Sequence, residues 1–185
     1  MTKTKWALDP THAQVNFKVR HLMIANVIGE FKSFTATAET DGDDIATAKV
    51  HFTADVHSIH TNNEQRDAHL RANDFFDAEH NPQIKFESER MEKIDNTHYK
   101  MHGMLTMRGI SKAETFNVEL NGIIQDPWGN TRMGVEVTGK VNRTDYGVSF
   151  GAMTDQTGGV MVGLDVAITC NAEMVKEKVA ETILA

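Results

Sequence analysis

Histidine is the residue type here that most readily suggests chemistry, since nine occur among 185 residues. A metal site needs imidazole, thiolate or carboxylate ligands at a spacing that brings them to one point. His57 and His60 are three residues apart, but no histidine pair stands four apart on an expected helix, and no His-Glu-x-x-His motif occurs. His51 and His57 alternate with apolar neighbours, which predicts an outward face. We therefore expect surface or hydrogen-bonded histidines and no metal site.

Nucleophilic catalysis has equally little support. Serine, histidine and aspartate are present, as in most chains, but no Gly-x-Ser-x-Gly elbow, phosphate loop or dinucleotide fingerprint occurs. The single cysteine, Cys170, falls within an expected strand and faces inward, where a buried thiol is usually inert. The sequence predicts a protein that is not an enzyme and has no cofactor.

Composition bounds the possible partners. A net charge of −7 argues against a nucleic-acid partner and against anchoring to an anionic membrane surface. The longest apolar runs, such as 160–164, are too short to span a bilayer. The first residues lack the apolar core of a signal peptide, so we expect a cytoplasmic protein unless an export signal has been removed. The length suits one domain over residues 1–185.

The elements that must position any site are strands, because apolar and polar residues alternate along most of the chain. About eight strands are expected, which suggests a closed antiparallel barrel or a sandwich. Composition does not choose between the two, and a filled core is the simpler expectation for the interior. The clearest inward faces are Val15, Phe17 and Val19; Val50, Phe52, Ala54 and Val56; and Val162, Leu164, Val166, Ile168 and Cys170.

Two helical segments interrupt this pattern. Helix formers follow the cap candidates Asn62 and Asn63, which predicts a short helix over about 63–72. The second is a C-terminal helix over 173–185, where apolar residues recur every four positions. It is expected to dock on its own domain, with a homodimer contact as the alternative.

An aromatic pair, Phe75 and Phe76, follows the first helical segment and lies between two aspartates. A polar surface loop has little use for two adjacent phenylalanines. Such a pair usually plugs a core edge or a pocket mouth.

Several motifs, each modest alone, resemble the YceI-like family in order and spacing. They cover nearly the whole chain: Trp6-x-Leu8-Asp9-Pro10-x-His12, Val15-x-Phe17-x-Val19-x-His21-Leu22-Met23, Val27-x-Gly29-x-Phe31-x-x-Phe34, the 58–76 insertion, Pro82-x-Ile84-x-Phe86-x-Ser88, Gly103-x-Leu105-Thr106-x-Arg108-Gly109 and Asn142-Arg143-x-Asp145-Tyr146-Gly147.

The resemblance implies an all-β, eight-stranded antiparallel lipocalin-like barrel that binds a long apolar lipid. Polyisoprenoids, isoprenoid quinones or prenyl phosphates are the implied ligands, with transport, storage or a stress-related role. The candidate ligand-binding residues are Phe17, His21, Phe31, Phe34, Val50, Phe52, Ala54, Arg66, His69, Arg71, Phe75, Phe76 and Leu164.

Two questions stay open at this stage. Arg66, His69 and Arg71 could meet a polar lipid head group, or could belong to a local network that holds the insertion against the barrel. The functional alternatives to a lipid carrier are an enzyme acting on an isoprenoid lipid, a histidine-based metal or haem protein, and a solid barrel that serves as an interaction module.

Overall fold

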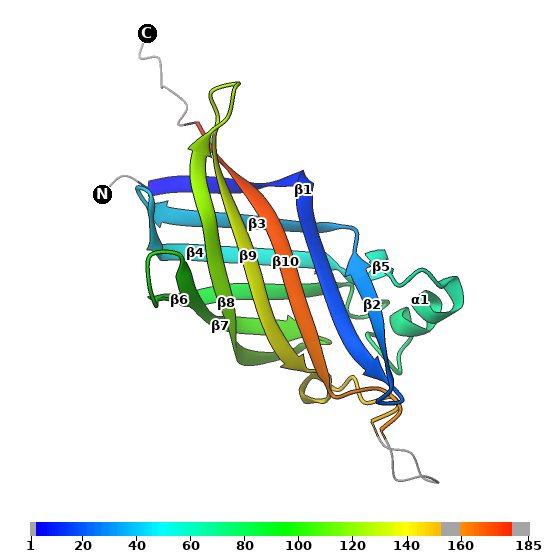
Figure 1. Cartoon of the computed structure of the whole chain (residues 1–185). Coiled ribbons are helices and arrows are strands. Elements are labelled where there is room, and N and C mark those ends of the chain that lie inside the picture. Colours follow the sequence, from blue (N-terminus) through cyan, green and yellow to red (C-terminus); the bar gives the residue numbers. More distant parts are fainter. Residues whose placement is uncertain (1–2, 153–159, 179–185) are drawn as a thin grey trace.

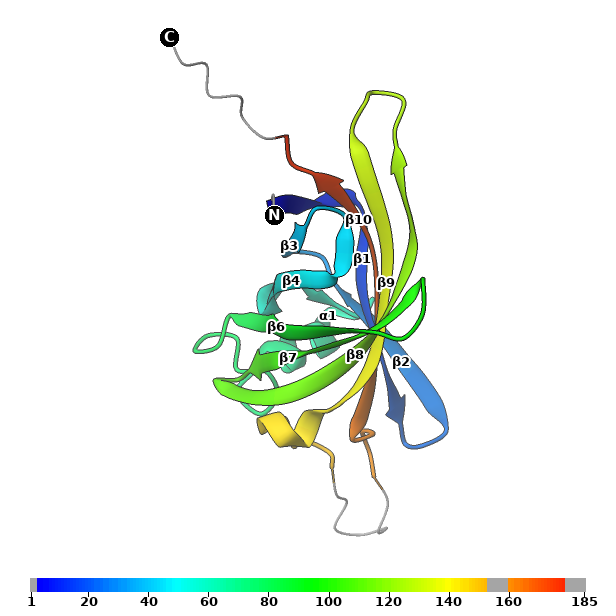
Figure 2. The same ribbon diagram turned by 90° about the vertical axis from the view of Figure 1, so that its left-hand side faces the viewer.

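The computed structural model describes residues 3–152 and 160–178, and its architecture is a strongly twisted antiparallel barrel (Figures 1 and 2). Its strands are β1 (Lys3–His21), β2 (Ala25–Phe31), β3 (Phe34–Asp41), β4 (Asp44–Asp55), β5 (Ile59–His60), β6 (Gln83–Lys93), β7 (His98–Met107), β8 (Ile110–Gln125), β9 (Thr131–Asn142) and β10 (Asp165–Lys176). The helical elements are α1 (Glu64–Arg71) and two 3-10 turns, η1 (Val56–Ser58) and η2 (Arg143–Tyr146).

Eight of these strands close the barrel, because β1 pairs with β3 on one edge and with β10 on the other. Trp6 marks the closure, since it lies opposite both Ala38 and Lys176. The predicted all-β, eight-stranded antiparallel barrel is confirmed. Closure satisfies the backbone groups that an open edge would leave unpaired.

The long strand β1 changes partner along its length. Residues 3–7 pair with β3, whereas residues 15–21 pair with β2, and the register with β10 shifts between Leu8 and Ala13. A shift of this kind bends a strand and increases its twist. The second half of β1, with β2 and β5, therefore extends the sheet beyond the closed ring, toward α1 (Figure 1).

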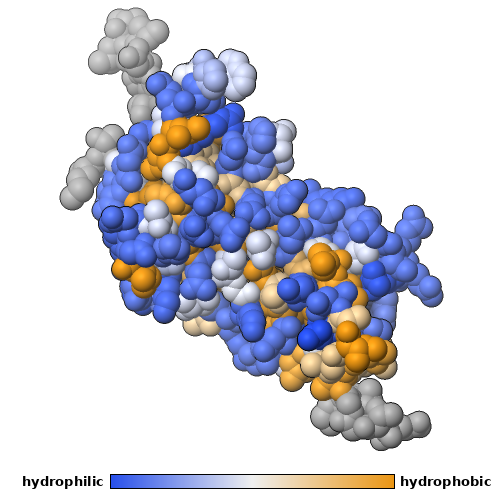
Figure 3. Space-filling view, viewed as in Figure 1, coloured by the Kyte–Doolittle hydropathy of each residue, from blue (hydrophilic) through white to orange (hydrophobic). Residues whose placement is uncertain are grey.

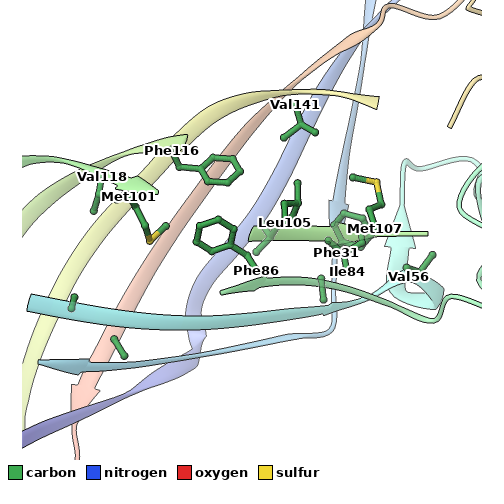
Figure 4. Close-up of a cluster of buried hydrophobic side chains, with 14 of the residues drawn as sticks. Phe31, Val56, Ile84, Phe86, Met101, Leu105, Met107, Phe116, Val118 and Val141 are labelled. Carbon is green, nitrogen blue, oxygen red and sulfur yellow. The ribbon is translucent and has the colours of Figure 1, made fainter. Parts of the chain in front are cut away.

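The predicted alternation sets which side chains enter the barrel. On β4, Val50, Phe52 and Ala54 point inward, whereas Lys49 and His51 are exposed. Figure 4 shows part of this interior, where Phe86 of β6 and Phe116 of β8 approach edge to face with ring centroids 5.3 Å apart. The interior is thus formed by alternate positions on every barrel strand.

The helical insertion is confirmed, since α1 begins after Asn63 and ends before Ala72. The Asn63 side chain accepts a hydrogen bond from the Arg66 backbone N–H at 2.8 Å, which caps the helix. Among residues 3–152 and 160–178, no helix is long and apolar enough to cross a membrane.

The C-terminal helix prediction is wrong for residues 173–176. These residues extend β10, with Met174 opposite Met133 and Val175 opposite Arg132. Apolar residues spaced by four fit a strand as well as a helix, because four is also a multiple of the strand period of two. Residues 179–185 lie outside the described residues.

Candidate functional site

A cavity of about 260 Å³ lies inside the barrel. Every strand of the closed ring contributes to its wall, and on β10 the wall runs from Val166 to Met174, about 27 Å along the strand. Apart from Gln14, Asn171 and Arg143, the lining residues are apolar. A space this long and narrow suits one slender apolar chain.

Most of the predicted aromatic and aliphatic residues lie on this wall. They are Phe17, Phe31, Phe34, Val50, Phe52, Ala54 and Phe76. They come from β1 to β4 and from the segment after α1, so residues far apart in sequence share one surface. Contact with a ligand stays a prediction for each of them.

Leu164 does not line the cavity, so its expected inward position is wrong. It is 37% exposed and precedes β10, whose inward positions begin at Val166. Val162 and Val166 do line the cavity. In a continuous strand Leu164 would lie on the same face as both, so the strand alternation is interrupted between Val162 and Val166. His21, at the end of β1, is exposed and also lies off the wall.

The two phenylalanines of the aromatic pair have different places. Phe76 lies on the cavity wall near Phe31, with ring centroids 6.4 Å apart. Phe75 is buried outside the cavity, where its ring packs against His69 and Phe150 at 4.9 and 5.0 Å. The pair therefore contributes one side chain to the wall and one to an aromatic layer behind it.

His69 belongs to that layer. Its ring packs edge-on against Phe150 at 4.7 Å, and its Nε2 lies 2.7 Å from Asp74 Oδ2. These contacts hold the imidazole in a partly exposed position, and His69 is not among the residues that line the cavity.

A hydrogen-bond network fastens α1 to β5 and Thr61. The buried Asp67 carboxylate accepts bonds from Thr61 N at 2.8 Å and Thr61 Oγ1 at 2.6 Å. Arg66 donates to Thr61 Oγ1 and O, each at 2.7 Å, and Arg71 Nη2 donates to Ile59 O at 3.2 Å. Both arginines therefore belong to a local network that holds the insertion against the barrel, which was one of the two alternatives for them.

Arg143 is a wall residue that the sequence analysis did not propose. It is 5% exposed and donates to three backbone carbonyls, those of Val148, Val162 and Gly163, at 2.6–2.8 Å. Burial lowers the pKa of this guanidinium. The bonds join η2 to the segment before β10 at one end of the cavity. The Asn-Arg-x-Asp-Tyr-Gly motif was the available signal.

Five methionines also line the cavity, although none was among the predicted ligand-binding residues. They are Met91, Met101, Met107, Met133 and Met174. Methionine is flexible and fills irregular space, so a wall rich in it can adapt to ligands of different width. Cys170 faces the same space, and burial raises the pKa of its thiol to about 12.

Asp9, His12 and Glu173 bring possible metal ligands within 4.8 Å of one another on the outer surface. Arg132 is already paired with both carboxylates of this cluster: its Nη1 lies 2.6 Å from Asp9 Oδ2 and 3.0 Å from Glu173 Oε2. Its Nε donates to Asp126 at 2.8 Å. The arrangement is an ion-pair network that links β1, β9 and β10.

Comparison with known proteins agrees with this architecture. The model of the YceI-like domain matches residues 6–174. A UPF0312 protein of Staphylococcus aureus (strain N315) is 39% identical over 171 residues, which cover 92% of this chain and 96% of the relative. The chain belongs to the YceI-like family.

Solved structures with the same fold include a Campylobacter jejuni YceI protein, which is 31% identical with a TM-score of 0.74 over 86% of this chain and 90% of that one. Burkholderia cenocepacia BcnA is 22% identical with a TM-score of 0.78, covering 90% and 98%. A polyisoprenoid binding domain from Saccharophagus degradans is 12% identical with a TM-score of 0.68, covering 93% and 98%. In this YceI-like chain the family motifs lie on β1, on β2 and the start of β3, in the insertion around β5 and α1, on β6 and β7, and at η2 beside the cavity.

Proposed function

We propose that this YceI-like protein binds one long, narrow apolar lipid inside its barrel and carries or sequesters it. The observation that carries the proposal is the apolar wall, which continues along most of the length of β1 and β10. Burying on the order of 500 Å² of apolar ligand surface would favour binding by roughly 12 kcal/mol. Ordering a flexible chain offsets much of that gain.

Polyisoprenoids, isoprenoid quinones and prenyl phosphates are the proposed ligand class. The name of the Saccharophagus degradans neighbour, a polyisoprenoid binding domain, supports this class. The methionines of the wall suit a branched chain of varying width, so we expect selection by length and width more than by chemistry.

Binding without catalysis is part of the proposal. Cys170 is the strongest nucleophile on the described wall, and its raised pKa leaves almost none of it as thiolate near neutral pH. Asp and Glu carboxylates and His imidazoles are not among the lining residues, so the described wall offers no general base beside it.

The decisive experiment is native mass spectrometry of freshly purified protein, followed by organic extraction and by titration of delipidated protein with an isoprenoid quinone. We expect one long-chain lipid per barrel and saturable uptake of the quinone. Protein that is lipid-free from several hosts and takes up neither quinone nor prenyl phosphate would refute the proposal.

A further inference from the structure

Exposed apolar side chains gather at the turn between β1 and β2. Leu22, Met23 and Ile24 are 50%, 54% and 82% exposed. Met161, 37% exposed, adjoins them because its carbonyl accepts a hydrogen bond from Leu22 N at 2.7 Å. We call these four residues the apolar tip; Figure 3 shows apolar surface at this end of the molecule.

The backbone of this turn is unusual for such residues. Leu22 and Met23 have φ of 49° and 59°, in the left-handed region that bulky side chains rarely adopt. Glycine or asparagine would form the same turn with less strain. Strain retained where apolar groups face solvent points to a binding role for those groups.

The apolar tip is continuous with the cavity. Val19, three residues before Leu22, lies on the cavity wall. Val162 follows Met161, bridges to His21 and lies on the same wall. The tip therefore stands at one end of the cavity.

The charges beside the tip differ from those of the whole chain. Residues 18–28 contain Lys18, Arg20 and His21 and no acidic residue, although the net charge of the chain is −7. The neighbouring strand β10 carries Asp165 at this end and Glu173 near its opposite end. Cations flanking an exposed apolar group suit a surface of lipid phosphates above hydrocarbon.

We propose that the apolar tip docks on the surface of a lipid bilayer and that the ligand passes between the bilayer and the cavity at this end. This proposal rests on the proposed lipid-binding function. It adds that the end of the cavity at the apolar tip faces a bilayer surface while the ligand enters. Insertion is shallow, because three consecutive side chains reach only the boundary between head groups and acyl chains.

The test compares two triple variants by co-sedimentation with vesicles of phosphatidylcholine and phosphatidylglycerol. The tip variant is L22N/M23N/I24Q, in which asparagine suits the left-handed turn. The control, I94Q/I124Q/W128Q, removes three apolar side chains that are 53%, 65% and 79% exposed and lie at the ends of β6 and β8 and in the β8–β9 turn. Transfer of an isoprenoid quinone from vesicles, and its uptake from detergent, are measured for both.

We expect the tip variant to bind vesicles at least about tenfold more weakly and to acquire quinone from them more slowly, while its uptake from detergent is unchanged. The control should match the unchanged protein in all three assays. The proposal would be overturned if both variants bound vesicles equally, or if the unchanged protein bound none. It would also be overturned if the tip variant lost self-association but kept its vesicle binding. If the unchanged protein failed to take up quinone from detergent, the proposed lipid-binding function would be refuted instead. Vesicle binding is measured without ligand, so the two failures can be told apart.

Discussion

Ala54 lies directly opposite Ile84 in the ladder between β4 and β6, and both side chains face the cavity. The small side chain at position 54 leaves space that a larger one would occupy. In a filled core, Ala54→Phe would overpack the site and destabilise the protein by roughly 1–3 kcal/mol.

We expect Ala54→Phe to weaken quinone binding at least about tenfold while ligand-free stability is kept or raised, because the ring enters space meant for lipid. Denaturant unfolding and a quinone titration measure the two effects. Thr53→Phe, which adds the same ring to the neighbouring outward position, is the control. An Ala54→Phe variant that unfolds early yet still binds would place the ligand elsewhere.

Cys170 is the single cysteine of the chain and lies on the cavity wall, so its reactivity reports on one site. With a pKa of about 12, we expect its reaction with methyl methanethiosulfonate at pH 8 to be at least about 100-fold slower than in urea. Bound quinone should slow the reaction further by covering the thiol. Equal rates with and without quinone would show that the ligand does not reach Cys170.

Asp67→Asn should destabilise the protein by about 2 kcal/mol, because the charged acceptor of two buried hydrogen bonds from Thr61 is lost. Urea unfolding measures the change. Glu64→Gln, at an exposed position of the same helix, should cost at most about 0.5 kcal/mol. If both variants lose the same small amount, the Asp67 contacts do not hold α1 in place.

The Arg132 network predicts a loss of stability in acid. Hydrogen bonds from Arg132, together with those from Asn130 and Trp128, hold the pKa of Asp126 at about 2, below its ordinary value of 3.8. The folded state therefore binds the proton more weakly than the unfolded state, and the stabilisation present above pH 4 is lost as pH falls toward 2. The urea midpoint should fall across this window, and less steeply in Arg132→Gln. Parallel curves for the two proteins would contradict this assignment.

Arg71 is a better candidate for a head-group contact than Arg66, which commits its Nε and Nη2 to Thr61. Arg71 Nε is buried and has no hydrogen-bond partner among residues 3–152 and 160–178. We expect Arg71→Gln to weaken binding of a prenyl phosphate about tenfold more than binding of a quinone, because the head-group contact is charge-assisted. Equal losses for both ligands would leave Arg71 only its role in holding α1.

The strand faces and α1 could be predicted because each depends on local pattern. Alternation placed Val50, Phe52 and Ala54 inside the barrel, and a cap residue before helix formers placed α1. Local pattern gave the wrong prediction at Leu164, which precedes β10 and does not belong to it. It also failed at residues 173–176, because apolar residues four apart fit both the helix period and the strand period. Closure could not be read from the residues, since alternation is the same in a sandwich. It depends on pairing between β1 and β10, and the family resemblance supplied that choice.

The pairing of β1 with β10 also dictates when the barrel can form. During synthesis β1 emerges first, and β10 follows only after about 150 further residues have been added. Until then one edge of β1 and one edge of β9 have no partner, and the apolar faces between them are open to water. The nascent chain therefore passes through an aggregation-prone stage, which ends only when β10 has been made and can pair with both β1 and β9.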